Sequence, residues 1–273
     1  MREKILIISG FLLSFSIGFM VGQILLIRTQ KVNPLVNQIV DRSLDKYTIE
    51  NLSKNASDVS ATLNMTKELK DYPEFTSNEF IMSANLNLDG KTMKKVSGLI
   101  NLPRRQAGIP NQKFPLIVMI RGYVPLDQYF IGNGTINGSI FFANHGYITL
   151  APDFLGYGDS DRESSDIFES RFQTYTTIVA LLKSVDNIPN WDHKNIFIWA
   201  HSNGGNIALT ILEITGAKYP TVLWAPVSSS FPFSVLYYSD ELTIKENFCD
   251  ENYLNLKMFI IQICIRWRII LIL

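Results

Sequence analysis

The chain has 273 residues, 47% of them apolar and 18% charged, and its 25 basic and 25 acidic side chains give a formal net charge of zero. This composition is typical of one globular domain with additional segments, and the lack of a dominant basic block argues against a nucleic-acid partner. Two cysteines are too few for a disulfide framework, and no residue spacing matches a metal site. We therefore expect no nucleic acid, no metal and no cofactor; composition carries no signal for an oligomeric state.

The amino terminus begins with a long apolar segment. Residues 5–27 contain no charged side chain. At about 1.5 Å per residue, a helix of this length spans the roughly 30 Å hydrocarbon core of a bilayer. We predict a single-pass anchor within residues 1–31, which makes membrane lipid a partner and places the rest of the chain outside the cytoplasmic membrane. A cleaved signal peptide and a buried core helix are the alternatives, but the segment is long and lacks a good small-residue cleavage site.

Residues 32–75 are mostly polar. Apolar residues recur at helical spacing between Val36 and Tyr47, and an Asn- and Ser-rich run follows at residues 55–60. The helical spacing fits either a stalk or a helix that lies on the domain, and we interpret residues 32–75 as a linker or stalk.

From residue 80 onward, strand and helix patterns alternate. Residues 80–87 and 96–102 predict a hairpin around the turn signal Asp89-Gly90. Further strands are expected at residues 114–120, 147–151, 196–200 and 221–225, and helical segments at residues 140–144, 172–184 and 206–215. A hairpin followed by alternating strands and helices implies the α/β class, with a mostly parallel sheet and helices on both faces.

The pentapeptide Ala200-His201-Ser202-Asn203-Gly204 lies between a predicted strand and a predicted helix. A sharp turn of small residues in this context is typical of a nucleophile elbow, which holds a serine hydroxyl clear of the sheet. We predict that Ser202 is a nucleophile. The backbone N–H of Asn203 and that of Tyr123, in the loop after the strand at residues 114–120, are the expected donors to a developing oxyanion.

Three blocks of sequence carry a resemblance to a known family. They are Ile120-Arg121-Gly122-Tyr123, the segment at residues 144–160 with its Gly-Tyr-Gly-Asp-Ser end, and the elbow. Over residues 80–240 the chain resembles the α/β-hydrolases, closest to the prolyl-oligopeptidase-like serine peptidases and the dienelactone-hydrolase-like enzymes. The resemblance implies acyl transfer from a peptide or ester substrate.

Two residues depart from the pattern of that family. Ala200 stands where the elbow more often has glycine, and Arg121 stands where many relatives have histidine. Neither change removes a group that the chemistry requires.

A base for Ser202 is harder to find. No histidine follows Ser202 in the chain, although in this architecture the acid and the histidine come after the serine. His201 is its direct neighbour, and adjacent side chains on a tight turn diverge. His145 and His193 each precede a predicted strand. We expect none of the three to deprotonate Ser202.

No carboxyl group stands out as the acid of a triad. Asp240 and Glu241 follow the strand at residues 221–225, one strand too early for the acid that the resemblance implies. Asp153 and Asp159 are interpreted as loop and turn residues.

The end of the chain is unusual. Residues 257–273 are almost entirely apolar, without a turn residue or a clear helical stripe, and Arg266 and Arg268 interrupt them. We expect an α/β-hydrolase domain over residues 76–256 that lacks its last strands, followed by an aberrant tail from a truncated or frameshifted reading. The alternative is a genuine short variant with a hydrophobic carboxy-terminal anchor.

Two functions fit these features. The first is a membrane-anchored serine hydrolase, a peptidase of the prolyl-oligopeptidase-like class, that cleaves a peptide or ester through Ser202. The second is a catalytically inactive hydrolase fragment or binding module.

Overall fold

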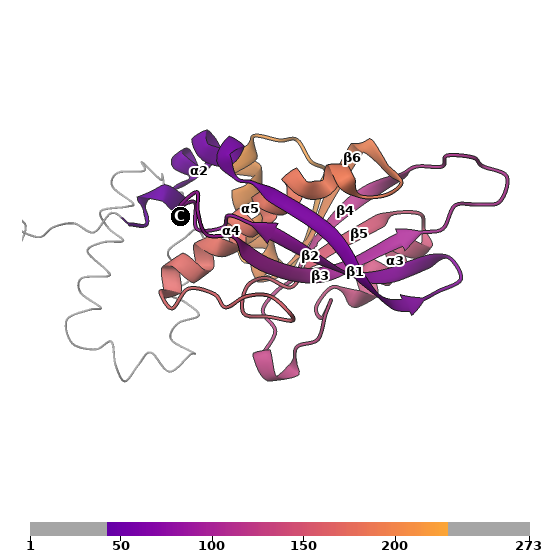
Figure 1. Cartoon of the computed structure of the whole chain (residues 1–273), viewed down its shortest axis with the longest axis horizontal. Coiled ribbons are helices and arrows are strands. Elements are labelled where there is room, and N and C mark those ends of the chain that lie inside the picture. Colours follow the sequence, from indigo (N-terminus) through magenta and orange to yellow (C-terminus); the bar gives the residue numbers. More distant parts are fainter. Residues whose placement is uncertain (1–42, 229–273) are drawn as a thin grey trace, which may run out of the picture. The chain divides into compact units, whose positions relative to one another are not determined.

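The computed structural model describes residues 43–228, which build one seven-stranded sheet flanked by helices (Figure 1). The strands are β1 (Ala61–Asp71), β2 (Phe75–Ala84), β3 (Lys94–Pro103), β4 (Phe114–Ile120), β5 (Ile148–Pro152), β6 (Trp191–His201) and β7 (Thr221–Trp224). The helices are α2 (Ile49–Asn55), α3 (Ile136–Asn144), α4 (Ile167–Ser184) and α5 (Asn203–Thr215), and single 3-10 turns lie at Asp45–Tyr47, Ala56–Asp58, Leu126–Gln128 and Val185–Asn187.

The sheet is antiparallel at one end and parallel at the other. Its strand order is β1-β2-β3-β5-β4-β6-β7. The first three strands form an antiparallel meander whose last member also pairs antiparallel with β5. The neighbouring pairs β5–β4, β4–β6 and β6–β7 are parallel. This arrangement confirms the predicted α/β class, in which a hairpin precedes parallel strands joined by helices.

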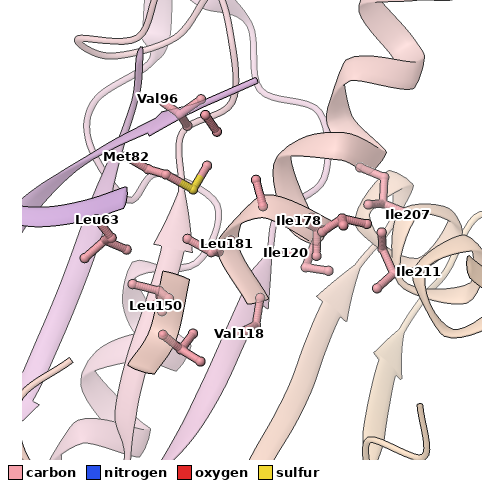
Figure 2. Close-up of a cluster of buried hydrophobic side chains, with 14 of the residues drawn as sticks. Leu63, Met82, Val96, Val118, Ile120, Leu150, Ile178, Leu181, Ile207 and Ile211 are labelled. Carbon is pink, nitrogen blue, oxygen red and sulfur yellow. The ribbon is translucent and has the colours of Figure 1, made fainter. Parts of the chain in front are cut away.

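Strand β4 lies inside the sheet, between β5 and β6, and both of its faces are apolar. Leu116, Val118 and Ile120 belong to the main core cluster, together with residues of α4 and α5. Figure 2 shows Ile120 beside Ile178 of α4, with Ile207 of α5 nearby, and all three belong to this cluster. The alternate residues of the strand, Ile117 and Met119, belong to a second cluster that includes Phe142 of α3. The helices therefore cover both faces of the sheet, as the continuous apolar run predicts.

Residues 44–71, expected to be part of a linker, instead fold with the domain. Tyr47 and Leu52 are buried in the core, and β1 pairs with β2 along its length. The compact unit accordingly begins at Leu44. The sequence misleads here because β1 is an edge strand with most of its residues exposed, so its polar composition resembles that of a linker.

The predicted hairpin exists, but its connection is longer than the turn signal suggests. Pairing of β2 with β3 ends at Ala84 and Lys94, so residues 85–93 form the loop. Within this loop the Asp89 carboxylate accepts hydrogen bonds from the amides of Lys91 and Thr92 at 2.9 and 2.8 Å. A local Asx-type turn therefore forms without joining the strands directly.

Several predictions fall outside the described residues. The apolar segment at residues 5–27, the tail at residues 257–273 and the expected loss of strands after residue 228 all lie there. Within residues 43–228, no helix combines the length and apolar character needed to cross a bilayer.

Candidate active site

Ser202 occupies the turn between β6 and α5, where the sequence places it. Its backbone has φ of 52° and ψ of −121°, a conformation that residues other than glycine rarely adopt. Hydrogen bonds hold it there: Ser202 N donates to Trp224 O of β7 at 3.0 Å, and Ser202 O accepts from Gly205 N and Val227 N, both at 2.9 Å. The neighbouring strand and helix thus stabilise the strained backbone that the sequence predicts for Ser202.

Three glycines allow the chain to close around this serine. A Cβ atom on Gly204 would lie 2.2 Å from Ile120 O of β4, and one on Gly205 would lie 2.4 Å from Pro226 Cβ. A Cβ atom on Gly122, in the loop after β4, would lie 2.9 Å from Ser202 Cβ. The small residues of the elbow are therefore required by the close approach of α5 and the β4 loop. Ala200, where relatives more often have glycine, fits fully buried in the core.

The two backbone amides expected to bind an oxyanion both border Ser202. Asn203 is the first residue of α5, and Tyr123 follows the glycine that touches Ser202. Neither amide N–H donates to an acceptor among residues 43–228. The Asn203 side chain accepts a hydrogen bond from the Arg171 guanidinium of α4, which anchors the helix start. The role of the Asn203 and Tyr123 backbone amides as donors to an oxyanion stays a prediction.

The His201 imidazole packs with two tryptophan rings. Its ring centroid lies 6.4 Å from that of Trp199 and 6.3 Å from that of Trp224, and the two tryptophan rings are 6.4 Å from each other. The imidazole Nδ1 borders the β4 loop, 3.4 Å from the place of a Cβ on Gly122. Within the described residues, it forms no hydrogen bond with Ser202.

The other two histidines lie where the parallel strands β5 and β6 begin, at the opposite end of these strands from Ser202. His145 caps α3, where its Nδ1 is 2.7 Å from Phe141 O, and His193 packs on Trp191 at a centroid distance of 4.7 Å. His145 precedes β5, and His193 lies near the start of β6, before the pairs that begin at Ile196, whereas Ser202 follows the end of β6. From Ile196 to Ser202 alone the chain advances about 20 Å at roughly 3.3 Å per residue. Neither side chain can reach the serine.

Asp153 is a loop residue, as the sequence suggested, but its side chain is buried. It directly follows β5 and is fully enclosed. One carboxylate oxygen accepts from the Ser97 hydroxyl at 2.6 Å, and the other accepts from the Tyr129 phenol. Burial raises the pKa of this carboxyl group, while those two hydrogen bonds and the nearby Arg121 oppose the rise. Its position after a buried strand in the middle sequence block was the signal that could have revealed it.

Known structures support the fold. Acetyl xylan esterase 1 from Thermoanaerobacterium sp. JW/SL YS485 matches 80% of this chain with a TM-score of 0.52 and 12% identity. An acetyl xylan esterase from Paenibacillus sp. R4 matches 79% with a TM-score of 0.52 and 17% identity. The chain spans 66% and 70% of the lengths of these two proteins. At such identities the likeness is one of fold, and that fold is the α/β-hydrolase fold.

No protein-family model and no curated protein matches the sequence.

Proposed function

We propose that this chain carries the nucleophile and the oxyanion site of a serine hydrolase. The observation that carries the proposal is the strained Ser202 at a strand-to-helix turn, with the loop of Gly122 and Tyr123 against it. In this reaction Ser202 Oγ would add to a substrate carbonyl carbon, and the carbonyl electron pair would move to the oxygen. The amides of Asn203 and Tyr123 would bind that oxygen. Collapse of the intermediate would expel the alcohol or amine, which leaves with the proton that the serine hydroxyl lost, and an acyl-serine would remain for water to hydrolyse.

The substrate we favour is an ester. The sequence resemblance pointed to a prolyl-oligopeptidase-like peptidase, and peptide and ester hydrolysis share the same machinery. The two similar structures are acetyl xylan esterases, and this favours an ester over a peptide.

An inactive hydrolase module is the second candidate. It is favoured by the three histidines, because none of them forms a hydrogen bond with Ser202 within residues 43–228. A serine hydroxyl is a weak nucleophile until a base accepts its proton. We therefore expect this chain to have little or no hydrolase activity, with at most the roughly 10³–10⁴-fold acceleration over water that an oxyanion site and binding can provide.

Labelling with a fluorophosphonate probe separates these possibilities. The phosphorus reacts with Ser202 Oγ, fluoride leaves, and the serine proton goes to a base. We expect slow labelling of Ser202, identified by peptide mass spectrometry, that added imidazole accelerates by supplying the base. The Ser202→Ala variant should lose the label, whereas Ser57→Ala, an exposed serine, should keep it.

Labelling that persists in the Ser202→Ala variant would contradict the proposed site. Labelling of the unmodified chain that imidazole does not accelerate would contradict it as well. Rapid Ser202-dependent labelling without imidazole would instead contradict the predicted low activity. It would show that a base is present, and His201 would then be the first residue to replace.

A further inference from the structure

The loop between β4 and the first turn after it is held by a buried arginine. Arg121 is only 6% exposed, and its guanidinium donates to two backbone carbonyls at once. Nη1 donates to Gly122 O at 2.9 Å, and Nη2 donates to Asp153 O at 2.7 Å, just after β5. The arginine thus ties the loop after one central strand to the end of the neighbouring strand.

A tyrosine from the Gly-Tyr-Gly segment holds the same loop from its other side. The Tyr157 ring lies over the Arg121 guanidinium, 4.1 Å from its Cζ to the ring centroid. The Tyr157 hydroxyl donates to Val124 O at 3.1 Å. The carbonyl groups on both sides of Tyr123 are therefore occupied, one by Arg121 and the other by Tyr157.

The direction of the Tyr123 N–H follows from the hydrogen bond between the Arg121 guanidinium and Gly122 O. Gly122 C=O and Tyr123 N–H belong to the same peptide unit, which is planar and trans, so they point in opposite directions. A hydrogen bond that fixes Gly122 O therefore also fixes the Tyr123 N–H. Gly122 has no Cβ to restrict its backbone, so this peptide plane depends on its hydrogen-bond partner for a single orientation.

Arg121 and Tyr157, which hold this loop, are themselves surrounded by further contacts. The Tyr129 ring also lies over the guanidinium, at 4.9 Å, and its phenol donates to the Asp153 carboxylate. A Cβ atom on Gly158 would lie 2.4 Å from that carboxylate, so the Gly-Tyr-Gly segment packs directly on it. These contacts restrict the Arg121 side chain to one conformation.

We propose that Arg121 and Tyr157 are positioning residues that orient the Tyr123 N–H toward the oxyanion formed at Ser202. This inference rests on the proposed serine-hydrolase site. It assigns a function to Arg121, the residue that departs from the histidine of the family pattern. Lysine cannot replace it, because only the planar guanidinium fork reaches two carbonyls while stacking on aromatic rings.

Equilibrium binding of phenylboronic acid tests the proposal without a catalytic base. Boron accepts an electron pair from Ser202 Oγ, a B–O bond forms, and the serine proton goes to the buffer. The tetrahedral boronate keeps both hydroxyl groups and carries the negative charge that the oxyanion site should bind. Boron NMR distinguishes this adduct from the trigonal free acid, and a titration gives its affinity.

The decisive variant is Tyr157→Phe, which removes only the hydroxyl that donates to Val124 O and keeps the ring on Arg121. We expect it to weaken boronate binding about threefold to tenfold, the effect of one neutral hydrogen bond. Arg121→Lys should weaken binding by more than tenfold. The matched control is Tyr47→Phe, which removes a phenol hydrogen bond to Glu169 in the same domain and should leave the affinity unchanged.

Each result has a defined meaning. If the unmodified chain forms the adduct but Tyr157→Phe binds as tightly, the positioning role is wrong and the serine site stands. Equal weakening by Tyr157→Phe and Tyr47→Phe would show a general effect on stability and would also overturn the positioning role. If the unmodified chain forms no Ser202-dependent adduct, the proposed function fails and the positioning role fails with it.

Discussion

Asp153, which follows β5, has a fully buried carboxyl group. Its two carboxylate oxygens accept hydrogen bonds from Ser97 and Tyr129, residues that are distant in sequence. Removal from water disfavours the charged form, and this raises the pKa of the Asp153 carboxyl group above its usual value. In the unfolded chain the group titrates near its ordinary pKa of about 3.9. The folded domain therefore binds a proton at Asp153 more readily than the unfolded chain does.

This shift predicts a specific pH dependence of stability. As the pH falls through the raised pKa of Asp153 toward about 3.9, the folded state takes up the proton first, so Asp153 contributes increasing stability. Urea unfolding of the wild-type chain and of Asp153→Asn should be compared across the acidic range. The free energy of unfolding of the wild type should rise relative to that of the variant as the pH is lowered. A wild type that instead loses stability relative to Asp153→Asn over this range would contradict the assignment.

At the scale of elements, the contact between β4 and α5 determines where the serine stands. The helix begins one residue after Ser202, and Gly204 in its first turn lies against the backbone carbonyls of Ile120 and Arg121. Backbone atoms of a central strand cannot move aside as a flexible side chain can. The elbow therefore depends on the absence of a side chain at this position of the helix.

Gly204→Ala should destabilise the domain, although alanine usually favours a helix by about 1 kcal/mol over glycine. The added methyl would lie 2.2 Å from Ile120 O and 2.6 Å from Arg121 O. We expect a loss of about 2–3 kcal/mol in the free energy of unfolding, measured with urea. Gly216→Ala is the matched control at the other end of α5, where φ is +62° but no atom lies within 4 Å. It should cost only about 1 kcal/mol, and an equal cost at both positions would contradict the steric argument.

At the scale of the whole molecule, the anchor remains a prediction from the sequence. Residues 5–27 lack charged side chains and lie outside the described residues. We propose that they hold the protein in a membrane as a single-pass anchor, with the hydrolase domain outside the cytoplasm.

Carbonate washing tests the anchor directly. The full chain should stay in the membrane fraction, because alkaline carbonate releases peripheral proteins but not a bilayer-spanning helix. A variant without residues 1–31 should be recovered in the supernatant. Recovery of a shortened soluble form from the full chain would instead indicate a cleaved signal peptide and would contradict the anchor.

The sequence by itself determined the parts of this fold that depend on local patterns. The apolar run of β4 coincides with its predicted limits, and β5, β6, α4 and α5 lie where the patterns place them, with ends that differ by a few residues. The elbow was also predictable, because a strand, a turn of small residues and a helix are contiguous in the chain. Periodicity and turn chemistry depend on near neighbours, and one sequence displays them fully.

Only the tertiary structure decided which distant residues meet. The polar sequence of β1 becomes an edge strand because β2 supplies its partner, and no local pattern indicates this pairing. The contacts of Arg121 with Asp153 and Tyr157 likewise join loops after two different strands. Side chains at the carboxyl ends of parallel strands meet through the order of the strands in the sheet, which the spacing of residues along one chain does not encode. For that reason the strand-to-helix turn at Ser202 could be predicted from the sequence, whereas the residues that contact the loop after β4 could not.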